Sequence, residues 1–242
     1  MRADVQLYQY GYFESRQKAK NEILAGNVKA DGRTIRKPSE DISEDAVIEI
    51  SENTLAFVSR GGLKLEAALK YFNIKVKGLT AVDIGASTGG FTDCLLQHGA
   101  KKVYAVDCGT DQLHEMLRHD DRVTSIEKFN ARLLAPETLG CRCDIAVMDV
   151  SFISQTLLYE NVASVLKPNG IFISLIKPQF EAGKEFLSKN GIVKDERIAE
   201  KTVCSIIESA RRNMLFDQGV IPSPIRGGDG NTEYLAYFKY IR

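Results

Sequence analysis

The 242-residue sequence has no hydrophobic run near the roughly 18 residues that a helix needs to cross a bilayer. Its N-terminal residues also lack the apolar stretch of a secretory signal. Proline and glycine are not abundant, at 6 and 19 residues, and hydrophobic residues make up 44%, which excludes collagen-like and disordered chains. We therefore expect an ordinary globular protein that works in the cytoplasm and has no membrane partner.

The cysteines do not form a recognisable framework. They are odd in number and scattered, unlike the disulfide pattern of a small secreted protein. Cys141 and Cys143 are separated by one residue, which is shorter than the gap of a zinc knuckle, and no second pair accompanies them. We expect reduced thiols and no metal site. The five cysteines are Cys94, Cys108, Cys141, Cys143 and Cys204.

The sequence also has no net charge, because 32 Lys and Arg balance 32 Asp and Glu. This balance argues against indiscriminate binding to nucleic acid. It hides a local excess, since residues 1–37 carry eight basic and four acidic residues, whereas residues 38–58 carry six acidic residues and no basic one. A short basic segment suits contact with phosphates, and a solvated helix face is an equal alternative.

Residues 1–58 are predicted to form a small α+β unit. A helix is expected at 3–11, and a second helix runs from an N-cap at Ser15 to a stop at Gly26. The Asp-Gly pair at 31–32 lies between short β-prone segments and predicts a tight hairpin, which a strand at 46–50 completes.

Basic residues of this unit are the predicted phosphate contacts. Arg16, Lys18 and Lys20 lie in the first turns of the second helix, where positive charge opposes the helix dipole. Local helix stability therefore does not explain them, whereas an external anion would; Lys29 and Arg33 join them. The aromatic residues are expected in the core rather than stacked on bases, because their spacing is helical. They are Tyr8, Tyr10, Tyr12 and Phe13.

Residues 59–62 are predicted to link this unit to a larger one at 63–242, and Arg60 to bridge the two. After a helix at 63–72, strands and helices alternate, which is typical of a parallel doubly wound sheet. The last two strands instead form an antiparallel hairpin. The predicted fold is α/β, Rossmann-like, with a small α+β domain in front. Strands are expected at 79–84, 102–107, 123–126, 144–150, 171–176, 215–221 and 234–240, and a late helix at 195–211.

A glycine-rich turn, Gly85–Gly89, follows the first strand of the larger unit and opens a helix. In open parallel sheets, ligands bind at the carboxyl ends of the strands. The spacing differs from the G-x-G-x-x-G pattern of pyrophosphate loops. Asp83 would repel a phosphate but hold an ammonium group. Asp107 ends the next strand, at the position where an acidic residue binds ribose hydroxyls. This pattern favours S-adenosylmethionine over a nicotinamide dinucleotide or a purely structural turn.

Two more charged residues come at the ends of apolar strands, Asp149 at the end of the fourth and Lys177 at the end of the fifth. Such groups are rarely buried unless paired, so the pair indicates a site, with a structural ion pair as the alternative. A lysine in a partly dry pocket loses hydration that favours its ammonium form. It could then accept a proton from a hydroxyl nucleophile while Asp149 orients it.

Five stretches of the sequence, taken in order, resemble the TlyA family, historically labelled haemolysin A. The resemblance covers nearly the whole chain. It implies an S-four-type RNA-binding domain followed by an FtsJ-like domain that methylates cytidine ribose 2′-hydroxyls of ribosomal RNA. Ribosomal RNA or ribosomal subunits are thus the expected partners, and a monomer or a dimer the expected state. The stretches are VSRGGLKL at 58–65, DIGASTGGFT at 83–92, MDVSF at 148–152, IKPQFE at 176–181 and GNTEY at 230–234.

The resemblance also implies site residues. It places the family's lysine–aspartate–lysine–glutamate tetrad on Lys64, Asp149, Lys177 and Glu233, and it implies an in-line methyl transfer that needs no metal. Three rivals stay open: a membrane-lytic protein, a catalytically silent RNA-binding protein and a small-molecule methyltransferase. The residues predicted to bind S-adenosylmethionine are Asp83, Gly85, Ala86, Ser87, Gly89, Phe91, Asp107, Asn130 and Asp149.

Overall fold

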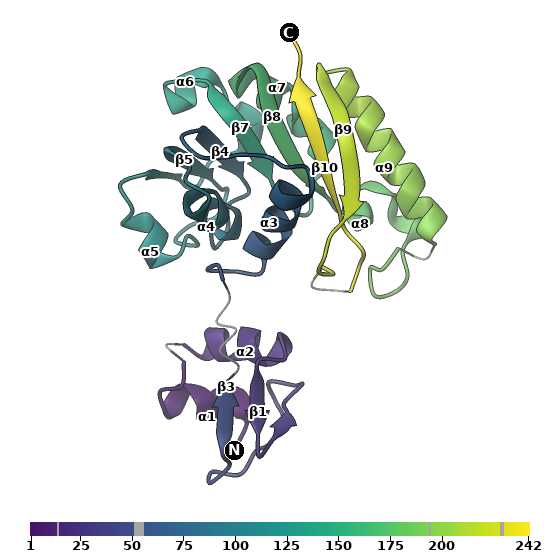
Figure 1. Cartoon of the computed structure of the whole chain (residues 1–242). Helices are drawn as coiled ribbons and strands as arrows, with labels where there is room; N and C mark the ends of the chain where they lie inside the picture. The colour runs from purple at the N-terminus through teal and green to yellow at the C-terminus, as the bar shows by residue number, and fades with distance from the viewer. Residues whose placement is uncertain (14, 51–55, 194, 228–229) are drawn as a thin grey trace. The chain divides into compact units, whose positions relative to one another are not determined.

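The computed structural model describes residues 1–13, 15–50, 56–193, 195–227 and 230–242. The chain divides into two compact units, Met1–Ala56 and Phe57–Arg242, drawn in purple and in blue to yellow in Figure 1. Each unit has its own core. Within the described ranges, no helix is both long and apolar enough to cross a membrane.

The first unit packs two helices against a three-stranded antiparallel sheet with the strand order β2-β1-β3. The Ser15 hydroxyl caps the second helix by accepting the backbone N–H of Lys18 at 3.1 Å. Asp31 and Gly32 both have positive φ, as a tight hairpin turn requires. The local sequence signals for this unit are confirmed. The elements are α1 (Ala3–Gln9), α2 (Arg16–Leu24), β1 (Val28–Ala30), β2 (Arg33–Thr34) and β3 (Ile48–Ile50).

The prediction that the tyrosines of this unit are buried is wrong. Tyr8, Tyr10 and Tyr12 are 48%, 53% and 43% exposed, and only Phe13 packs against the core. Tyr10 and Tyr12 come after the end of α1 at Gln9, so they do not continue its helical face. Tyr8 lies within α1 but outside its buried positions, which are Ala3, Asp4, Gln6 and Leu7.

The second unit is built on a seven-stranded sheet with the order β6-β5-β4-β7-β8-β10-β9. The first five strands in this order are parallel, and β10 pairs antiparallel with both β8 and β9. The predicted α/β fold with a terminal hairpin is confirmed. The strands are β4 (Thr80–Ile84), β5 (Lys102–Val106), β6 (Val123–Ile126), β7 (Cys143–Met148), β8 (Leu166–Ile176), β9 (Leu215–Pro222) and β10 (Tyr234–Tyr240).

Helices cover both faces of this sheet (Figure 1). On β7, Ile145 and Val147 face the layer that contains α3 and α4, whereas Ala146 and Met148 face the layer that contains α7 and α9. Both faces are buried, which explains the nearly continuous apolar sequence of the strand. The helices are α3 (Gly61–Tyr71), α4 (Gly90–Gln97), α5 (Glu115–Arg118), α6 (Pro136–Leu139), α7 (Tyr159–Val165), α8 (Pro178–Glu181) and α9 (Glu196–Arg211), with short 3-10 helices η1 (Ala131–Leu133), η2 (Gln155–Leu158) and η3 (Lys184–Phe186).

The structure places residues 59–62, which the sequence predicted as a linker, inside the second unit. Helix α3 already begins at Gly61. A Cβ on Gly62 would lie 2.2 Å from the ring of Phe57, and one on Gly90 would lie 2.2 Å from the Ser59 hydroxyl. These close approaches pack the segment against the start of α4. The division between the units therefore comes earlier in the chain than residue 58.

Candidate active site

The glycine-rich turn lies between β4 and α4 and runs close to the end of β7. Gly85 has a φ of 83°, and a Cβ there would lie 2.5 Å from the carbonyl oxygen of Asp149. Gly89 has a φ of 96°, and a Cβ there would lie 2.3 Å from Leu117. Only glycine fits such positions, because they combine a left-handed backbone with a close neighbour. The turn therefore passes close to the backbone of Asp149, and its exposed residues are Ser87 and Thr88.

Asp83 is fully buried two residues before this turn. Its Oδ2 accepts a hydrogen bond from the Thr92 hydroxyl at 2.7 Å, while Oδ1 has no hydrogen-bond partner among the described residues. Burial raises the pKa of Asp83 to about 7; the Thr92 hydrogen bond opposes this shift, and the carboxylates of Asp149 and Asp107 add to it. A nearby cation would favour the ionised carboxyl. The turn and this carboxyl therefore fit the ammonium of S-adenosylmethionine.

Asp107 follows β5, at the same sheet edge. Its Oδ2 accepts the backbone N–H of Ser87 at 2.8 Å, and its Oδ1 accepts that of Gly109 at 2.7 Å. The carboxylate thus joins the glycine-rich turn to the next strand-end loop. Each oxygen keeps a lone pair with which to accept a ribose hydroxyl.

Two other residues predicted to bind the methyl donor have structural contacts. Asn130 is exposed, and its side chain caps η1 by accepting the N–H of Arg132 at 3.0 Å. Its neighbour Phe129 donates its backbone N–H to the carbonyl of Asp107 at 3.0 Å, which places this segment beside the Asp107 loop. Phe91 is 3% exposed and packs in the core, so only its backbone is near the turn.

The four residues of the predicted tetrad form two ion pairs. Lys177 Nζ lies 2.6 Å from Asp149 Oδ1, and Lys64 Nζ lies 2.5 Å from Glu233 Oε2. The second pair is the more buried, with side-chain exposures of 11% and 3%.

Sheet register brings the two pairs to one edge. Tyr234 is paired with Ile176 across β10 and β8, so Glu233 and Lys177 flank the same register position. On the other side of β8, Asp149 directly follows β7. The carboxyl ends of β4, β7 and β8, which carry the turn, Asp149 and Lys177, therefore meet where a ligand binds in sheets of this type.

Sequence reasoning missed Phe152, which lies beside the Asp149–Lys177 pair. Its side chain is 91% exposed and its φ is 64°, a conformation that bulky residues rarely adopt. Its ring lies 5.0 Å from that of Phe180, and Lys177 Nζ lies 6.0 Å from the centroid of the Phe180 ring. An exposed aromatic residue with a strained backbone supports the hypothesis of a functional site here. The aromatic residue right after the Asp149 motif was the available sequence signal.

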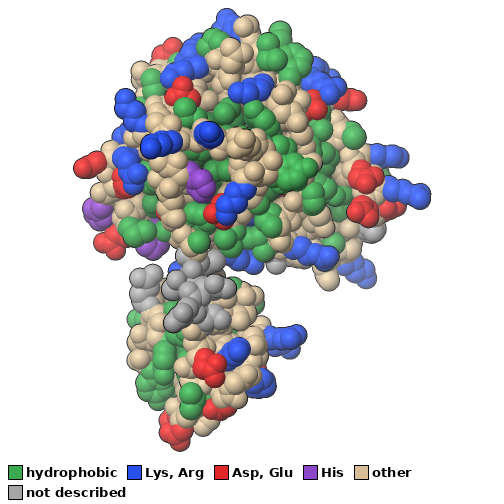
Figure 2. Space-filling view, viewed as in Figure 1, with side chains coloured by type: hydrophobic (Ala, Val, Ile, Leu, Met, Phe, Trp, Pro, Cys, Tyr) green, Lys and Arg blue, Asp and Glu red, His purple; other side chains and the backbone are tan. Residues whose placement is uncertain are grey.

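The predicted phosphate contacts lie on α2, β1 and β2 of the first unit, where Figure 2 shows several Lys and Arg side chains at the surface. Some also have internal partners. Arg16 donates to buried Asp4 at 2.8 Å, and Arg33 lies 2.6 Å from Glu40. Burial would raise the pKa of Asp4, but the hydrogen bonds from its arginine partners outweigh it and lower that pKa. The remaining candidates are Lys18, which pairs with Glu22 at 3.7 Å, the half-exposed Lys20, the exposed Lys29 and, in the second unit, the exposed Arg60.

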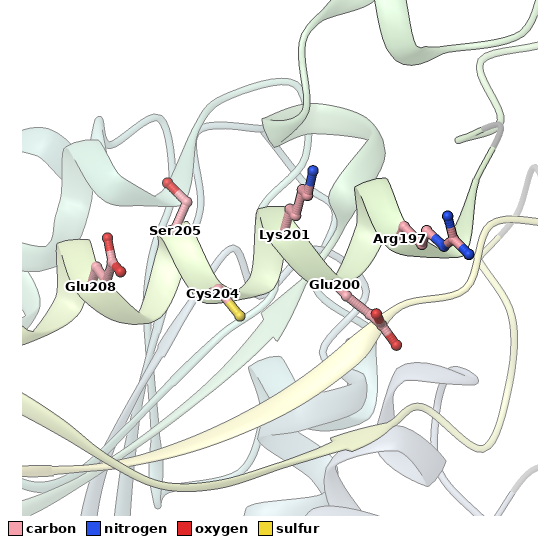
Figure 3. Close-up of a pocket in the computed structure, with 6 residues that line it drawn as sticks. All are labelled: Arg197, Glu200, Lys201, Cys204, Ser205 and Glu208. Carbon is pink, nitrogen blue, oxygen red and sulfur yellow. The ribbon is translucent and has the colours of Figure 1, made fainter.

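Two surface hollows lie along and beside α9. One follows the outer face of α9, and all of its labelled side chains come from that single helix (Figure 3). The other lies between α8 and α9 and includes Glu181 and Phe186. Neither contains a residue predicted to bind the methyl donor. Within the described ranges, no group of three or more His, Cys, Asp or Glu residues is arranged to hold a metal ion.

Comparison with known proteins assigns a family to each of the two units. The chain matches the FtsJ-like methyltransferase family over residues 57–240 and the S4 domain over residues 1–48. It is 39% identical to the 16S/23S rRNA (cytidine-2′-O)-methyltransferase TlyA of Mycobacterium tuberculosis, over 98% of this chain and 89% of that protein. It is 44% identical to Hemolysin A of Brachyspira hyodysenteriae, over 98% of this chain and 99% of that protein.

A solved structure is similar as well. It is a Streptococcus thermophilus protein described as a candidate hemolysin, and it is 44% identical with a TM-score of 0.80, covering 100% of this chain and 88% of that one. Together, the two family matches cover residues 1–48 and 57–240. The chain therefore belongs to the FtsJ-like methyltransferase family, in the group that carries an S4 domain and includes TlyA.

Proposed function

We propose that this protein transfers a methyl group from S-adenosylmethionine to a cytidine ribose 2′-hydroxyl of ribosomal RNA. The observation that carries the proposal is the Asp149–Lys177 pair, held at 2.6 Å beside the glycine-rich turn. The TlyA relative that is 39% identical is named for this reaction. An ion pair with only a structural role would not need this place at the carboxyl ends of the strands.

On the donor side, the backbone of Gly85–Gly89 and the carboxyl of Asp83 hold the amino-acid end of S-adenosylmethionine. Asp107 receives the ribose hydroxyls, and Asn130 lies toward the adenine. Bound S-adenosylmethionine supplies an electrophilic methyl group on a sulfonium. The protein's task is to fix the two reactants in line, which can account for several kcal/mol of the barrier.

Lys177 is the group that acts on the nucleophile. Asp149 and the Ser151 hydroxyl, at 2.6 and 2.7 Å, hold its Nζ in place. Once it has released a proton to solvent, the Nζ accepts the 2′-hydroxyl proton while the 2′-oxygen bonds to the methyl carbon and the carbon–sulfur bond breaks. Lys64 and Glu233 lie on the β10 side of Lys177, and their pairing leaves neither buried charge uncompensated.

On the RNA side, the basic residues of the first unit contact phosphates, and its three exposed tyrosines offer flat faces for unpaired bases. In the second unit, the exposed ring of Phe152 offers such a face next to Lys177. Single-stranded or extruded nucleotides are the RNA elements that proteins read by stacking. The target cytidine would thus be held outside its helix.

The test measures transfer of labelled methyl from S-adenosylmethionine to ribosomal subunits that lack their native ribose methylations. Wild type should label the RNA, and Lys177→Ala should not. Lys167→Ala is a matched control, because Lys167 pairs with Asp144 at 2.7 Å at the opposite ends of the same two strands. Wild type that binds the donor but labels neither subunit nor free ribosomal RNA would overturn the substrate assignment.

A further inference from the structure

The segments that carry Asp149 and Lys177 continue beyond the β-ladder that aligns their strands. The pairing of β7 with β8 ends at Met148 and Ser174. Lys177 then caps a helix of only four residues, α8. A helix of this length has little stability of its own, so side-chain contacts must fix it. The carbonyl of Lys177 accepts the N–H of Phe180 at 3.0 Å, so Lys177 is part of the first turn of α8. A shift of α8 would therefore move the backbone that carries the Lys177 ammonium.

Glu181, the last residue of α8, supplies two of these contacts. Its Oε2 accepts the Ser154 hydroxyl at 2.6 Å, and its Oε1 accepts the backbone N–H of Gln155 at 2.8 Å. Both donors belong to the segment that follows Asp149, at the start of η2. The carboxylate therefore joins the Lys177 segment to the Asp149 segment, and hydrogen bonds to a charged acceptor are about twice as strong as neutral ones.

The start of η2, to which Glu181 binds, is itself held by buried hydrogen bonds. The side chain of Gln155 is 2% exposed, and its Oε1 accepts the hydroxyl of Tyr159 on α7 at 3.0 Å and the hydroxyl of Ser174 on β8. The start of η2 is thus anchored to the sheet and to the helix that covers it. Glu181 connects α8 to this anchor. Burial raises the pKa of Glu181, a cost that a group without a defined role would not need to bear.

We propose that Glu181 is a positioning residue, which holds α8 so that Lys177 stays within ion-pair distance of Asp149. This inference rests on the proposed function, because it assigns the pair its catalytic task. Glu181 need not touch either reactant. The backbone of Asp149 is held by its N–H bond to the Ile84 carbonyl at 3.0 Å, and Ile176 pairs with Tyr234 of β10, whereas α8 lies past the end of β8. Glu181 ties α8 to the segment after Asp149, and its loss would let the Lys177 side chain move away from the carboxylate.

Two substitutions of Glu181 distinguish its hydrogen bonds from its negative charge. Glu181→Ala removes both acceptors. In Glu181→Gln, the amide oxygen can accept the Gln155 N–H while the amide nitrogen donates to the Ser154 hydroxyl oxygen, so the link survives without its charge. Glu181 also lines the hollow between α8 and α9, so water can reach the donors that Glu181→Ala frees. Ser154→Ala removes one of the two hydrogen bonds and gives a milder loss.

The experiment measures kcat, KM for RNA and the Kd for S-adenosylmethionine, together with the crystal structure of each variant. Glu181→Ala should lower kcat by about 10- to 100-fold, since a displacement of about 1 Å in a reacting group has effects of this size. The Kd for the donor should not change, and Glu181→Gln should restore most of kcat. Glu208→Ala, on the outer face of α9 (Figure 3), is the control and should match wild type.

The crystal structures decide the inference even if no RNA is methylated. In Glu181→Ala, the distance from Lys177 Nζ to Asp149 Oδ1 should exceed 2.6 Å, and in Glu181→Gln it should stay there. An unchanged distance in Glu181→Ala would overturn the positioning role, as would a wild-type kcat. Wild type without any transfer would overturn the proposed function alone. If Glu181→Ala does not fold, Ser154→Ala replaces it, and a wild-type distance together with a wild-type kcat in that variant would overturn the inference.

Discussion

The carboxyl of Asp83 is fully buried, and burial raises its pKa from 3.8 to about 7. Between these values, the folded protein holds a proton that the unfolded chain has released. The free energy of unfolding therefore falls as the pH rises through this window, by about 1.4 kcal/mol per pH unit. From about pH 5.5 to about pH 8, the loss comes to about 2 kcal/mol, because it ends near pH 7.

Asp83→Asn removes the titration and keeps the shape, including an oxygen that accepts the Thr92 hydroxyl. The Tm of wild type should therefore fall relative to that of the variant by about 4–8 °C between these two pH values. Differential scanning calorimetry of the donor-free protein, read on the transition of the second unit, measures this. Equal Tm differences at both pH values would refute the reasoning, because Asp83 would then not hold its proton.

The same carboxyl predicts a pH-dependent affinity for the donor. Only its ionised form attracts the ammonium of S-adenosylmethionine, so the affinity of wild type should rise as the pH passes about 7. The affinity of Asp83→Asn should be lower and should not rise through this range. Isothermal titration calorimetry at the two pH values measures both. Equal affinities of wild type at both would place the ammonium away from Asp83.

Three further predictions concern the rest of the site. Gly85→Ala should lower Tm and donor affinity more than Gly78→Ala. Both glycines have positive φ, but only at Gly85 would the added Cβ lie 2.5 Å from a carbonyl oxygen. Equal losses in the two variants would contradict the close approach. Lys64→Ala should destabilise the protein by about 3–5 kcal/mol in urea unfolding, since it leaves a buried carboxylate unpaired, and adding Glu233→Gln should recover part of this loss. Phe152→Ala should raise KM for RNA about 10-fold while leaving the donor Kd unchanged, with Phe152→Trp restoring it; stacking of one base contributes about 1–3 kcal/mol.

Local patterns predicted the elements well. The Ser15 cap, the Asp31–Gly32 turn and the alternation of strands and helices each act over a few residues, so they can be read without knowing the fold. The same patterns placed Asp149 and Lys177 correctly after parallel strands, at one sheet edge. The exposure of Tyr10 and Tyr12 was misjudged, because a helix that ends at Gln9 gives no periodicity signal there.

The sequence by itself thus determined the order of the elements, the turn and the strand-end charges, because these depend on neighbours in the chain. Only the tertiary structure decided which charges meet. Lys64 and Glu233 are 169 positions apart, and they pair because β10 inserts between β8 and β9. The exposed ring of Phe152 and the link from Glu181 to Ser154 likewise depend on how two strand-end segments pack. Burial and pairing of this kind depend on strand order, which no local pattern specifies.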